Sequence, residues 1–409
     1  MNPGPADVGD NDARVELVLA LGEALHRHGA PAHRLEEALG LVSARLGLDG
    51  RFFATPTSIL ASFGPVAAQR TSLVRVEPGE MDLEKLALLH DVTSELIDGR
   101  LDVTTARARV ARILQFQSRY GALVTVLSYG LASAASAVFL GGTPVEISGA
   151  LGLGIVVGVM VTLGVAVASL RRILEPLAAL VTSAGATLLA HQVGGVSAYL
   201  VTLAGVISLL PGLGVTTAMT ELASRHLISG TARLAGAVVH LLGLGVGVAL
   251  GARVGMLLPG VEVTTESGTW PLGLLAAAVV GASVGFMVQV KAPLRDTPWI
   301  VGTGALAFAG TRVGSVALGA ELGAFVGAFL VAAASNLYAR ALNRPATVTL
   351  VPAILLLVPG SVGFRSVFSM LEKQVVPAVD AAFTMVLVAI SLVAGLLVAN
   401  AAVPPRRPL

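Results

Sequence analysis

Two apolar stretches of the 409-residue chain are interrupted in the same way, about 148 residues apart. The interrupting residues are Pro211, Gly212 and Gly214 in "SLLPGLGVTTAMTEL" and Pro359, Gly360 and Gly363 in "LLVPGSVGFRSVFSML". A charged residue follows each break, Glu221 in the first stretch and Arg365 in the second. Pro and Gly unwind a helix, and the unwound backbone exposes N–H and C=O groups that can hold a small polar ligand.

Ionisable side chains inside apolar segments are costly and usually functional. The candidates here are Glu221, Arg312, Glu321 and Arg365. A carboxylate in a low-dielectric site can exchange a proton near neutral pH, whereas Arg stays protonated and would hold a substrate carboxylate or neutralise an acid. Hydroxyl and amide groups near the breaks can hydrogen-bond a zwitterion, although such groups also join packed membrane helices. These neighbours are Ser208, Thr216, Thr217, Thr220, Gln289 and Asn336.

Glu221 follows the first break by nine residues, which is roughly 13 Å along a continuing helix. This distance favours a gate or a proton relay on the cytoplasmic side over direct contact with a substrate at the break. Glu221 is therefore predicted to couple protons or to hold a substrate amine. The alternative is a structural ion pair with Arg225 or Arg233.

The composition is that of a membrane protein, with 55% hydrophobic and 13% charged residues and a mean hydropathy of +0.82. The charges are segregated, because residues 1–119 contain 16 Asp/Glu and 13 Lys/Arg and the other 290 residues contain 9 and 14. A soluble domain over 1–119 therefore precedes a membrane domain. The first 18 residues do not match a signal peptide, and the absence of Cys excludes disulfides and thiolate chemistry.

The soluble domain is predicted to have the element order ααββαα. Helices are expected over 15–28, 31–46, 81–99 and 104–121, and strands over 51–63 and 69–78. Gly29 is expected to end the first helix, and Asp82 and Thr104 to cap the last two.

Ten apolar segments of membrane-spanning length follow. They cover 121–140, 149–169, 175–191, 196–222, 231–252, 270–289, 297–313, 318–338, 346–371 and 378–401. With residues 1–119 in the cytoplasm, ten basic loop residues fall inside and three outside, which predicts cytoplasmic N- and C-termini and an inner-membrane location.

The two breaks fall in the fourth and ninth segments, so each is fourth in a block of five. An odd block size inverts the second block relative to the first, and inverted repeats with paired broken helices are a transporter architecture. The predicted repeats are 120–258 and 259–403, followed by a short basic tail at 404–409, and the breaks are expected to meet near the centre of the fold. Two alternatives stay open: the Pro-Gly pairs only kink packed helices, or each pair ends a span and leaves Glu221 at the membrane surface.

Two motifs resemble the threonine/serine exporter family. "GEALHRHGAPAHRLEEALGLVSARLGL" followed by "FFATPTSILASF" is similar to its N-terminal domain, and "PGLGVTTAMTELASRHLISGTARLAG" is similar to its pattern after the fourth span. The matching residues are Gly29, His33, Arg34, Thr55 and Thr57 in the first motif and Pro211, Gly212, Glu221, Ser229, Gly230 and Arg233 in the second. The family often has Asp where this chain has Glu221.

The resemblance covers residues 15–400 and implies secondary export of threonine and serine, driven as antiport by the proton-motive force. Some family members are linked to the export of dicarboxylates such as succinate, so the family alone does not fix the substrate. The implied partners are a small-molecule substrate, protons and the lipid bilayer, with no nucleic acid and no cofactor. A homo-oligomer is left open.

The soluble domain permits a rival hypothesis, a sensor or hydrolase anchored by its membrane part. The domain's motif residues are His33, Arg34, Glu37, Thr55 and Thr57. His26 and His28 are two residues apart and point to different sides of a helix, which disfavours a metal site. The chain is therefore expected not to be an enzyme and to hold no metal, with the soluble domain gating or stabilising the membrane domain.

Overall fold

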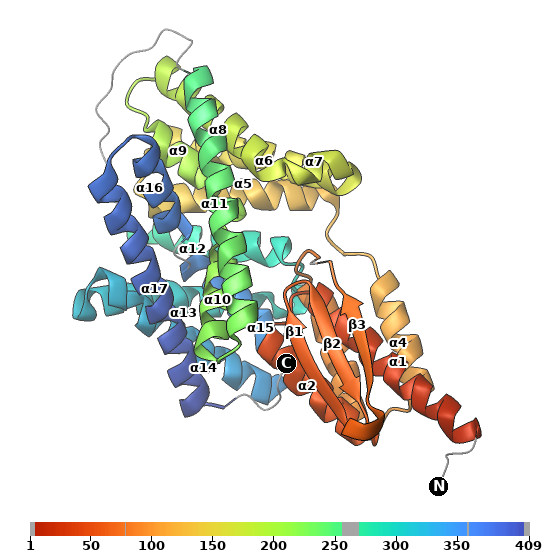
Figure 1. Cartoon of the computed structure of the whole chain (residues 1–409). Coiled ribbons are helices and arrows are strands. Elements are labelled where there is room, and N and C mark those ends of the chain that lie inside the picture. The colour runs from red at the N-terminus through yellow and green to blue at the C-terminus, as the bar shows by residue number, and fades with distance from the viewer. Residues whose placement is uncertain (1–4, 78, 256–269, 358–359, 405–409) are drawn as a thin grey trace.

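The computed structural model describes residues 5–77, 79–255, 270–357 and 360–404. Its N-terminal part is an α+β domain packed beside a larger helical part (Figure 1). The elements of this domain are α1 (Pro5–Arg27), α2 (Ala32–Arg45), β1 (Gly50–Thr55), β2 (Ser58–Phe63), the 3-10 turn η1 (Val66–Ala68), β3 (Arg70–Arg75), α3 (Leu83–Ile97) and α4 (Val103–Gln115). The two predicted pairs of helices are present, with the sheet between them in the chain.

The sheet has three antiparallel strands in the order β1-β2-β3, so the prediction of two strands is wrong. The segment expected as one strand over 51–63 is a hairpin, in which Thr55 pairs with Ser58 across a turn at Pro56 and Thr57. Pro56 has no N–H to donate to a ladder, so it interrupts the strand and favours a turn.

The helix ends follow the expected cap chemistry with one exception. Gly29 adopts φ +102°, a left-handed conformation that suits glycine after a helix. Asp82 caps α3 by accepting from Lys85 N at 3.0 Å. The predicted cap Thr104 is wrong, because Asp102 accepts from Thr105 N at 2.9 Å and α4 begins one residue earlier, at Val103. Both residues are capping types, and the carboxylate is the stronger acceptor for helix N–H groups.

The rest of the described chain is helical. Its elements are α5 (Ala122–Phe139), α6 (Pro144–Ala166), α7 (Ala168–Arg172), α8 (Leu174–Gln192), α9 (Ala198–Gly205), η2 (Ile207–Leu209), α10 (Gly212–Ala223), α11 (Leu227–Gly255), α12 (Leu272–Gln289), η3 (Leu294–Asp296), α13 (Thr297–Leu318), α14 (Ala320–Leu342), α15 (Thr347–Leu357), α16 (Gly360–Leu371) and α17 (Val375–Ala402). Eight segments of the described residues are long and apolar enough to span a membrane, and the bent pair α9–α10 makes a ninth. The helix α8, which covers the third predicted span, is not among them.

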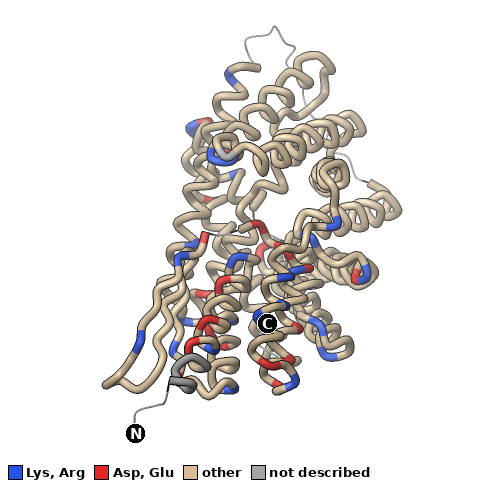
Figure 2. Tube along the Cα trace, turned by 90° about the vertical axis from the view of Figure 1, so that its right-hand side faces the viewer, with Lys and Arg blue, Asp and Glu red and all other residues tan. Residues whose placement is uncertain are grey.

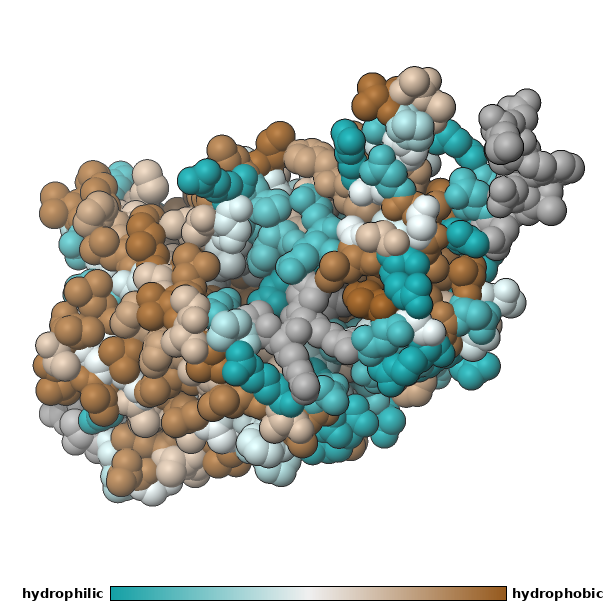
Figure 3. Space-filling model, turned by 90° about the horizontal axis from the view of Figure 1, so that it is seen from below, coloured by the Kyte–Doolittle hydropathy of each residue, from teal (hydrophilic) through white to brown (hydrophobic). Residues whose placement is uncertain are grey.

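Charge and hydropathy divide the molecule in the same way as the fold. Charged residues gather around the N-terminal domain and at helix ends, and the helices farthest from that domain carry few (Figure 2). Seen from below, brown apolar surface covers much of the side away from the N-terminal domain (Figure 3). The core of the N-terminal domain nevertheless continues into the helical part, because Leu83 and Leu86 belong to one apolar cluster with Met287, Val290 and Ile300.

Glycines let α8 and α11 approach closely. A Cβ placed on Gly251 of α11 would contact Leu180 O and lie 2.8 Å from Ser183 Cβ and 2.9 Å from Ala184 N, all in α8. A Cβ on Gly243 of the same helix would meet no atom within 4 Å. Gly251 is therefore a contact position, whereas Gly243 has open space beside it.

We expect Gly251→Ala to destabilise the protein, because the added methyl group must push α8 away, and such overpacking costs about 1–3 kcal/mol. Thermal unfolding in detergent micelles should show a midpoint several degrees lower than that of the parent protein. Gly243→Ala is the matched control and should unfold at or slightly above the parent midpoint. Equal midpoints for the two variants would contradict this packing.

Candidate functional site

The two Pro-Gly segments lie close together in the helical part. Near the first, the chain bends by 49° at Val206, between α9 and the segment from η2 through α10, and Pro211 immediately precedes α10. The second predicted break falls between α15 and α16, and its Pro359 lies outside the described residues. A Cβ on Gly360, the first residue of α16, would lie 3.0 Å from Leu210 Cβ and 3.6 Å from Gly212 Cα. The structure therefore brings together two segments that the sequence separates by about 148 residues.

Both breaks line one cavity of about 240 Å³. Pro211 and Gly214 border it from the first break, and Gly360 and Ser361 border it from the second. This volume lies below the roughly 300–1,000 Å³ of pockets for drug-sized ligands, so the cavity suits a small metabolite.

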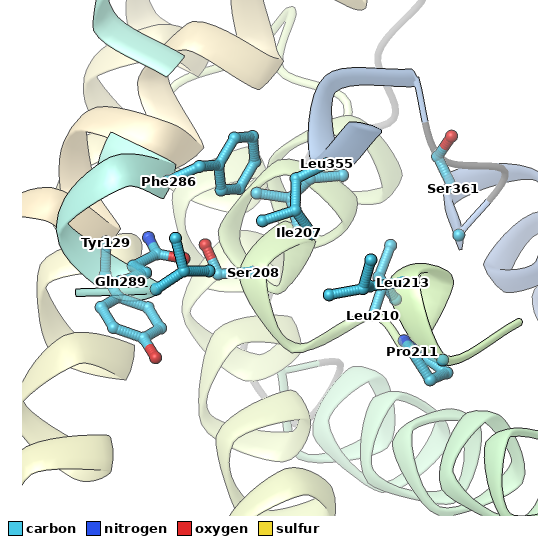
Figure 4. A pocket seen from close by; sticks show the side chains of 13 residues that line it. Tyr129, Ile207, Ser208, Leu210, Pro211, Leu213, Phe286, Gln289, Leu355 and Ser361 are labelled. Atoms are coloured by element: carbon cyan, nitrogen blue, oxygen red, sulfur yellow. The ribbon is translucent and has the colours of Figure 1, made fainter. Parts of the chain in front are cut away.

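The cavity has mostly apolar walls and a few polar groups. Ser208, Gln289 and the Tyr129 hydroxyl lie on one side, and Ser361 lies on the opposite side (Figure 4). Gln289 Nε2 donates to Ser128 O at 3.3 Å, which leaves its carbonyl oxygen for another donor. Ser208 Oγ is buried and makes no hydrogen bond to any described residue. The described lining has no charged side chain.

The N-terminus of α10 supplies the positive potential that the side chains do not. The helix α10 has twelve residues and begins beside the cavity, whose lining includes Pro211, Leu213 and Gly214. The first N–H groups of a helix have no partner within the helix, and they lie at the positive end of its dipole. Within the described part of the chain, the N–H groups of Gly212, Leu213 and Gly214 donate to no acceptor. The cavity can therefore bind a carboxylate through backbone donors.

The predicted threonines of α10 do not line the cavity. Thr216 Oγ1 donates to Gly212 O at 3.1 Å, and Thr220 Oγ1 donates to Thr216 O at 2.9 Å, so both hydroxyls bind their own helix. Thr217 is half-buried. Gly363 is buried where α16 packs on its neighbours, and a Cβ there would meet Met385 Sδ at 2.5 Å.

Three charged residues predicted to bind substrate or protons lie on exposed faces. They are Arg312 of α13, Glu321 of α14 and Arg365 of α16, and none of them borders the cavity. Asn336 is also distant from it and donates to Asn400 Oδ1 at 2.8 Å. Of the polar neighbours expected near the breaks, the structure thus brings Ser208 and Gln289 to the cavity.

Glu221 is fully buried and accepts four hydrogen bonds (0% exposed). Arg233 donates from Nε at 3.1 Å and from Nη2 at 3.0 Å, and Ser229 Oγ donates at 2.9 Å. The fourth donor is Ala32 N at 3.1 Å, from the first residue of α2 in the N-terminal domain. Of the two roles considered for Glu221, this geometry favours the ion pair with Arg233, because a buried carboxylate with a bidentate partner is held firmly.

The histidine-containing motif of the N-terminal domain lies beside this ion pair. The rings of His33 and His226 are 5.9 Å apart. Glu36 joins the two parts, since its Oε1 accepts from Ala54 N at 2.7 Å and its Oε2 lies 3.3 Å from His226 Nε2. The predicted residue Glu37 is exposed instead. The sequence could have pointed to Glu36, because this residue follows Ala32 by four positions and therefore lies on the same face of the helix.

The remaining motif residues have local positions. Thr55 Oγ1 lies 2.8 Å from Ser58 Oγ across the hairpin turn, and Thr57 is exposed in that turn. Arg34 is half-buried on α2. No group of three or more His, Asp or Glu side chains arranged for a metal ion occurs in the described parts of the chain.

Two polar residues of the cavity lining were not predicted, Tyr129 and Ser361. Tyr129 is one of only four tyrosines and lies inside an apolar span. Ser361 follows directly after the second Pro-Gly pair. Both signals were present in the sequence, but nothing in the linear pattern indicates which face of an apolar helix turns towards a cavity.

Removing the partner of Glu221 should be strongly destabilising. We expect Arg233→Gln to cost about 3–5 kcal/mol, because it leaves a buried carboxylate without its counter-charge. Arg225→Gln, at an exposed position in the preceding turn, should be close to neutral. Thermal unfolding in detergent measures both, and adding Glu221→Gln to Arg233→Gln should recover part of the loss. Equal midpoints for Arg233→Gln and Arg225→Gln would show that the ion pair is not formed.

Comparison with known proteins identifies the family. The model described as "Putative threonine/serine exporter" matches residues 16–255, and the one described as "Threonine/Serine exporter, ThrE" matches residues 274–402. Similar curated proteins are named "Pheromone-regulated membrane protein 10". Those of Debaryomyces hansenii, Candida albicans and Eremothecium gossypii are 28%, 30% and 28% identical, over 86% of this chain and 36%, 33% and 49% of their own lengths.

The chain thus spans between about a third and a half of these yeast relatives. No solved structure matches it. Because the two family models together cover most of the sequence, this multi-pass membrane protein belongs to the threonine/serine exporter family.

Proposed function

We propose that the protein is a secondary exporter of small metabolites that carry a carboxylate, with its substrate site in the cavity between α10 and α16. The observation that carries this proposal is that both helix breaks line one cavity. Broken helices at corresponding positions of two halves mark the substrate sites of many transporters. A kink that only improved packing would not need a second break opposite to it.

Threonine or serine is the first substrate we propose. The N-terminus of α10 offers N–H donors to the substrate carboxylate, and the carbonyl oxygen of Gln289 can accept from its ammonium group. Ser208 Oγ can pair with the substrate hydroxyl. The second proposal is a dicarboxylate such as succinate, whose second carboxylate could accept from the hydroxyl of Ser361, which also lines the cavity.

We propose ten spans in two inverted five-span repeats, with both termini in the cytoplasm. One supporting observation is a repeated helix contact. A Cβ on Gly154 of α6 would contact Ser133 of α5, and a Cβ on Gly304 of α13 would contact Ser283 of α12. The two pairs have the same residue types, in the first and second helices of each proposed repeat.

A second correspondence lies where the fourth helix of each proposed repeat begins. Glu146, at the start of α6, accepts from Ser197 N at 2.6 Å just before α9. Asp296, just before α13, pairs with Arg344 just before α15. An acid thus fixes the approach to the broken helix in both halves, which supports the repeat.

We propose coupling to the proton-motive force on the basis of the family. The described cavity lining contains no carboxylate, so a proton would have to bind elsewhere. Glu221 is our candidate because it lies on the same helix as Gly212 and Gly214. Its four hydrogen bonds stabilise the carboxylate, so we expect it to accept a proton only when its contacts open.

Efflux from proteoliposomes tests this function. Vesicles preloaded with labelled threonine, serine or succinate should release one of them faster than protein-free vesicles. A proton gradient directed into the vesicles, with the outside more acidic than the inside, should accelerate this release. Efflux of none of the three would reject these substrates, and efflux unaffected by the gradient would reject proton coupling.

Filling the cavity should block transport without unfolding the protein. Gly214 borders the cavity, and a Cβ there would meet no atom within 4 Å, so Gly214→Leu would occupy the cavity rather than disturb the packing. We expect efflux to fall by at least about tenfold, which corresponds to roughly 1.4 kcal/mol, with an unchanged unfolding midpoint. Gly243→Leu places the same side chain in open space on α11 and is the control. Normal efflux by Gly214→Leu would place the substrate site elsewhere.

A further inference from the structure

The N-terminal domain is attached to two helices that border the cavity. At its first attachment, the N-terminus of α3 meets the C-terminal end of α12. Leu83 N donates to Val290 O at 3.0 Å, and Glu84 N donates to Lys291 O at 3.1 Å. Val290 and the preceding Gln289 both line the cavity. This contact therefore connects the N-terminal domain to one wall of the cavity.

This first attachment is extensive and mostly apolar. Met287, Val290 and Ala292 belong to the hydrophobic core of the N-terminal domain. Tyr120 Oη donates to Ala292 O at 2.5 Å, and Lys291 pairs with Glu80 at 2.7 Å. Separating these surfaces would expose part of a continuous core, so we regard this attachment as permanent.

The second attachment is polar and reaches the opposite wall. The N-terminus of α2 binds Glu221 through Ala32 N, and Glu36 contacts His226. Glu221 lies near the end of α10, the helix whose early residues Leu213 and Gly214 line the cavity. The N-terminal domain thus bridges α10 and α12, and these two helices can separate only if one attachment opens.

We propose that the N-terminal domain is a latch on the half-helix α10, which opens at the contact between α2 and Glu221, pivots on α3–α12, and is released by acidification. This inference deepens the proposed function and rests on it, because the latch controls access to the same cavity. The polar contact opens because water can satisfy its charged and hydrogen-bonding groups once they separate, whereas water cannot compensate for an exposed apolar core.

Two histidines of the N-terminal domain, buried His26 and half-buried His33, make the latch sensitive to acid. The groups that face His33 are Arg34, His226, Glu221 and Arg233, and Arg233 also faces His26. Burial, with Arg34 beside it, lowers the pKa of His33 to about 4 from 6.5. Burial also lowers the pKa of His26, although nearby backbone carbonyl groups raise it in part.

The direction of the pH effect follows from these shifts. Above about pH 7.5, one unit above the ordinary pKa of 6.5, both imidazoles are neutral whether the latch is closed or open, and the contact has its full strength. Between pH 6.5 and pH 4 the opened state binds protons that the closed state does not, so acid favours opening. An imidazole with a pKa of 6.5 when free and about 4 when latched increases the open population about tenfold at pH 5.5.

A single thiol can report the opening, because the chain has no Cys. Ser229→Cys places a thiol beside Glu221 at a position that is 2% exposed, and Thr231→Cys places one at an exposed position two residues away. The ratio of their maleimide labelling rates in the full-length protein cancels the pH dependence of the thiol chemistry. We expect this ratio to rise about tenfold from pH 7.5 to pH 5.5.

Variants assign the response to the latch. In the Ser229→Cys protein, Glu221→Gln should raise the labelling ratio already at pH 7.5, and Arg233→Lys is a milder second variant that keeps the charge. His26→Gln combined with His33→Gln should remove the rise at pH 5.5. His28→Gln is the matched control, because buried His28 lies near Asp82, Lys85 and Lys291 at the other attachment. A pH response that survives the double replacement, or that disappears with His28→Gln, would overturn the proposal.

A thiol in the cavity tests whether the latch controls the site. Ser208→Cys lines the cavity. We expect its rate of labelling by a water-soluble maleimide, divided by that of Thr231→Cys at the same pH, to be higher at pH 5.5 than at pH 7.5 and higher in the presence of Glu221→Gln. Unchanged labelling of Ser208→Cys while Ser229→Cys becomes accessible would show that the latch opens without affecting the cavity, which would refute the inference. No substrate is needed, so an absence of threonine, serine or succinate efflux would reject the proposed function without deciding this result.

Discussion

The fold depends on one constraint, which is that backbone N–H groups in an apolar environment need acceptors. Three helix N-termini lie close to the functional region of the described structure, those of α2, α3 and α10. The carbonyl groups of Val290 and Lys291, just after α12, satisfy α3, and Glu221 satisfies the first N–H of α2. The first N–H groups of α10 have no acceptor in the described structure. The cavity beside these N–H groups has room for a ligand that supplies a hydrogen-bond acceptor.

This constraint also explains why an acidic residue at the far end of α10 is buried. Glu221 lies where α10, α11 and the N-terminal domain meet. Its carboxylate belongs to α10, and α11 and the N-terminal domain provide its donors. The ion pair with Arg233 alone would join only α10 and α11. Because the fourth hydrogen bond comes from Ala32, the position of α10 and the position of the N-terminal domain depend on the same charge.

The sequence predicted the features that arise from local chemistry. Pro211 and Gly212 located the first break, and Gly29 and Asp82 correctly marked helix ends, because these residues act through their own backbone or nearest neighbours. Prediction failed where neighbouring groups compete or where tertiary contacts decide. Asp102 caps α4 in place of Thr104, and Pro56 turns the expected single strand into a hairpin. In the apolar helices the sequence has no polar periodicity, so it could not show that Arg365 faces outward or that Tyr129 lines the cavity.

The different positions of Glu36 and Glu37 show how the contact between Ala32 and Glu221 orients the helix α2. The two residues have the same side chain at adjacent positions, and the motif predicted for the soluble domain included only the second. The structure uses the first, because a step of four residues from Ala32 keeps Glu36 on the face that meets His226, whereas Glu37 is rotated into solvent. The face of α2 that contacts the helical part is therefore set by where its N-terminus binds. Fixing Ala32 on Glu221 determines which carboxylate of α2 reaches α10–α11 and which histidine lies between them.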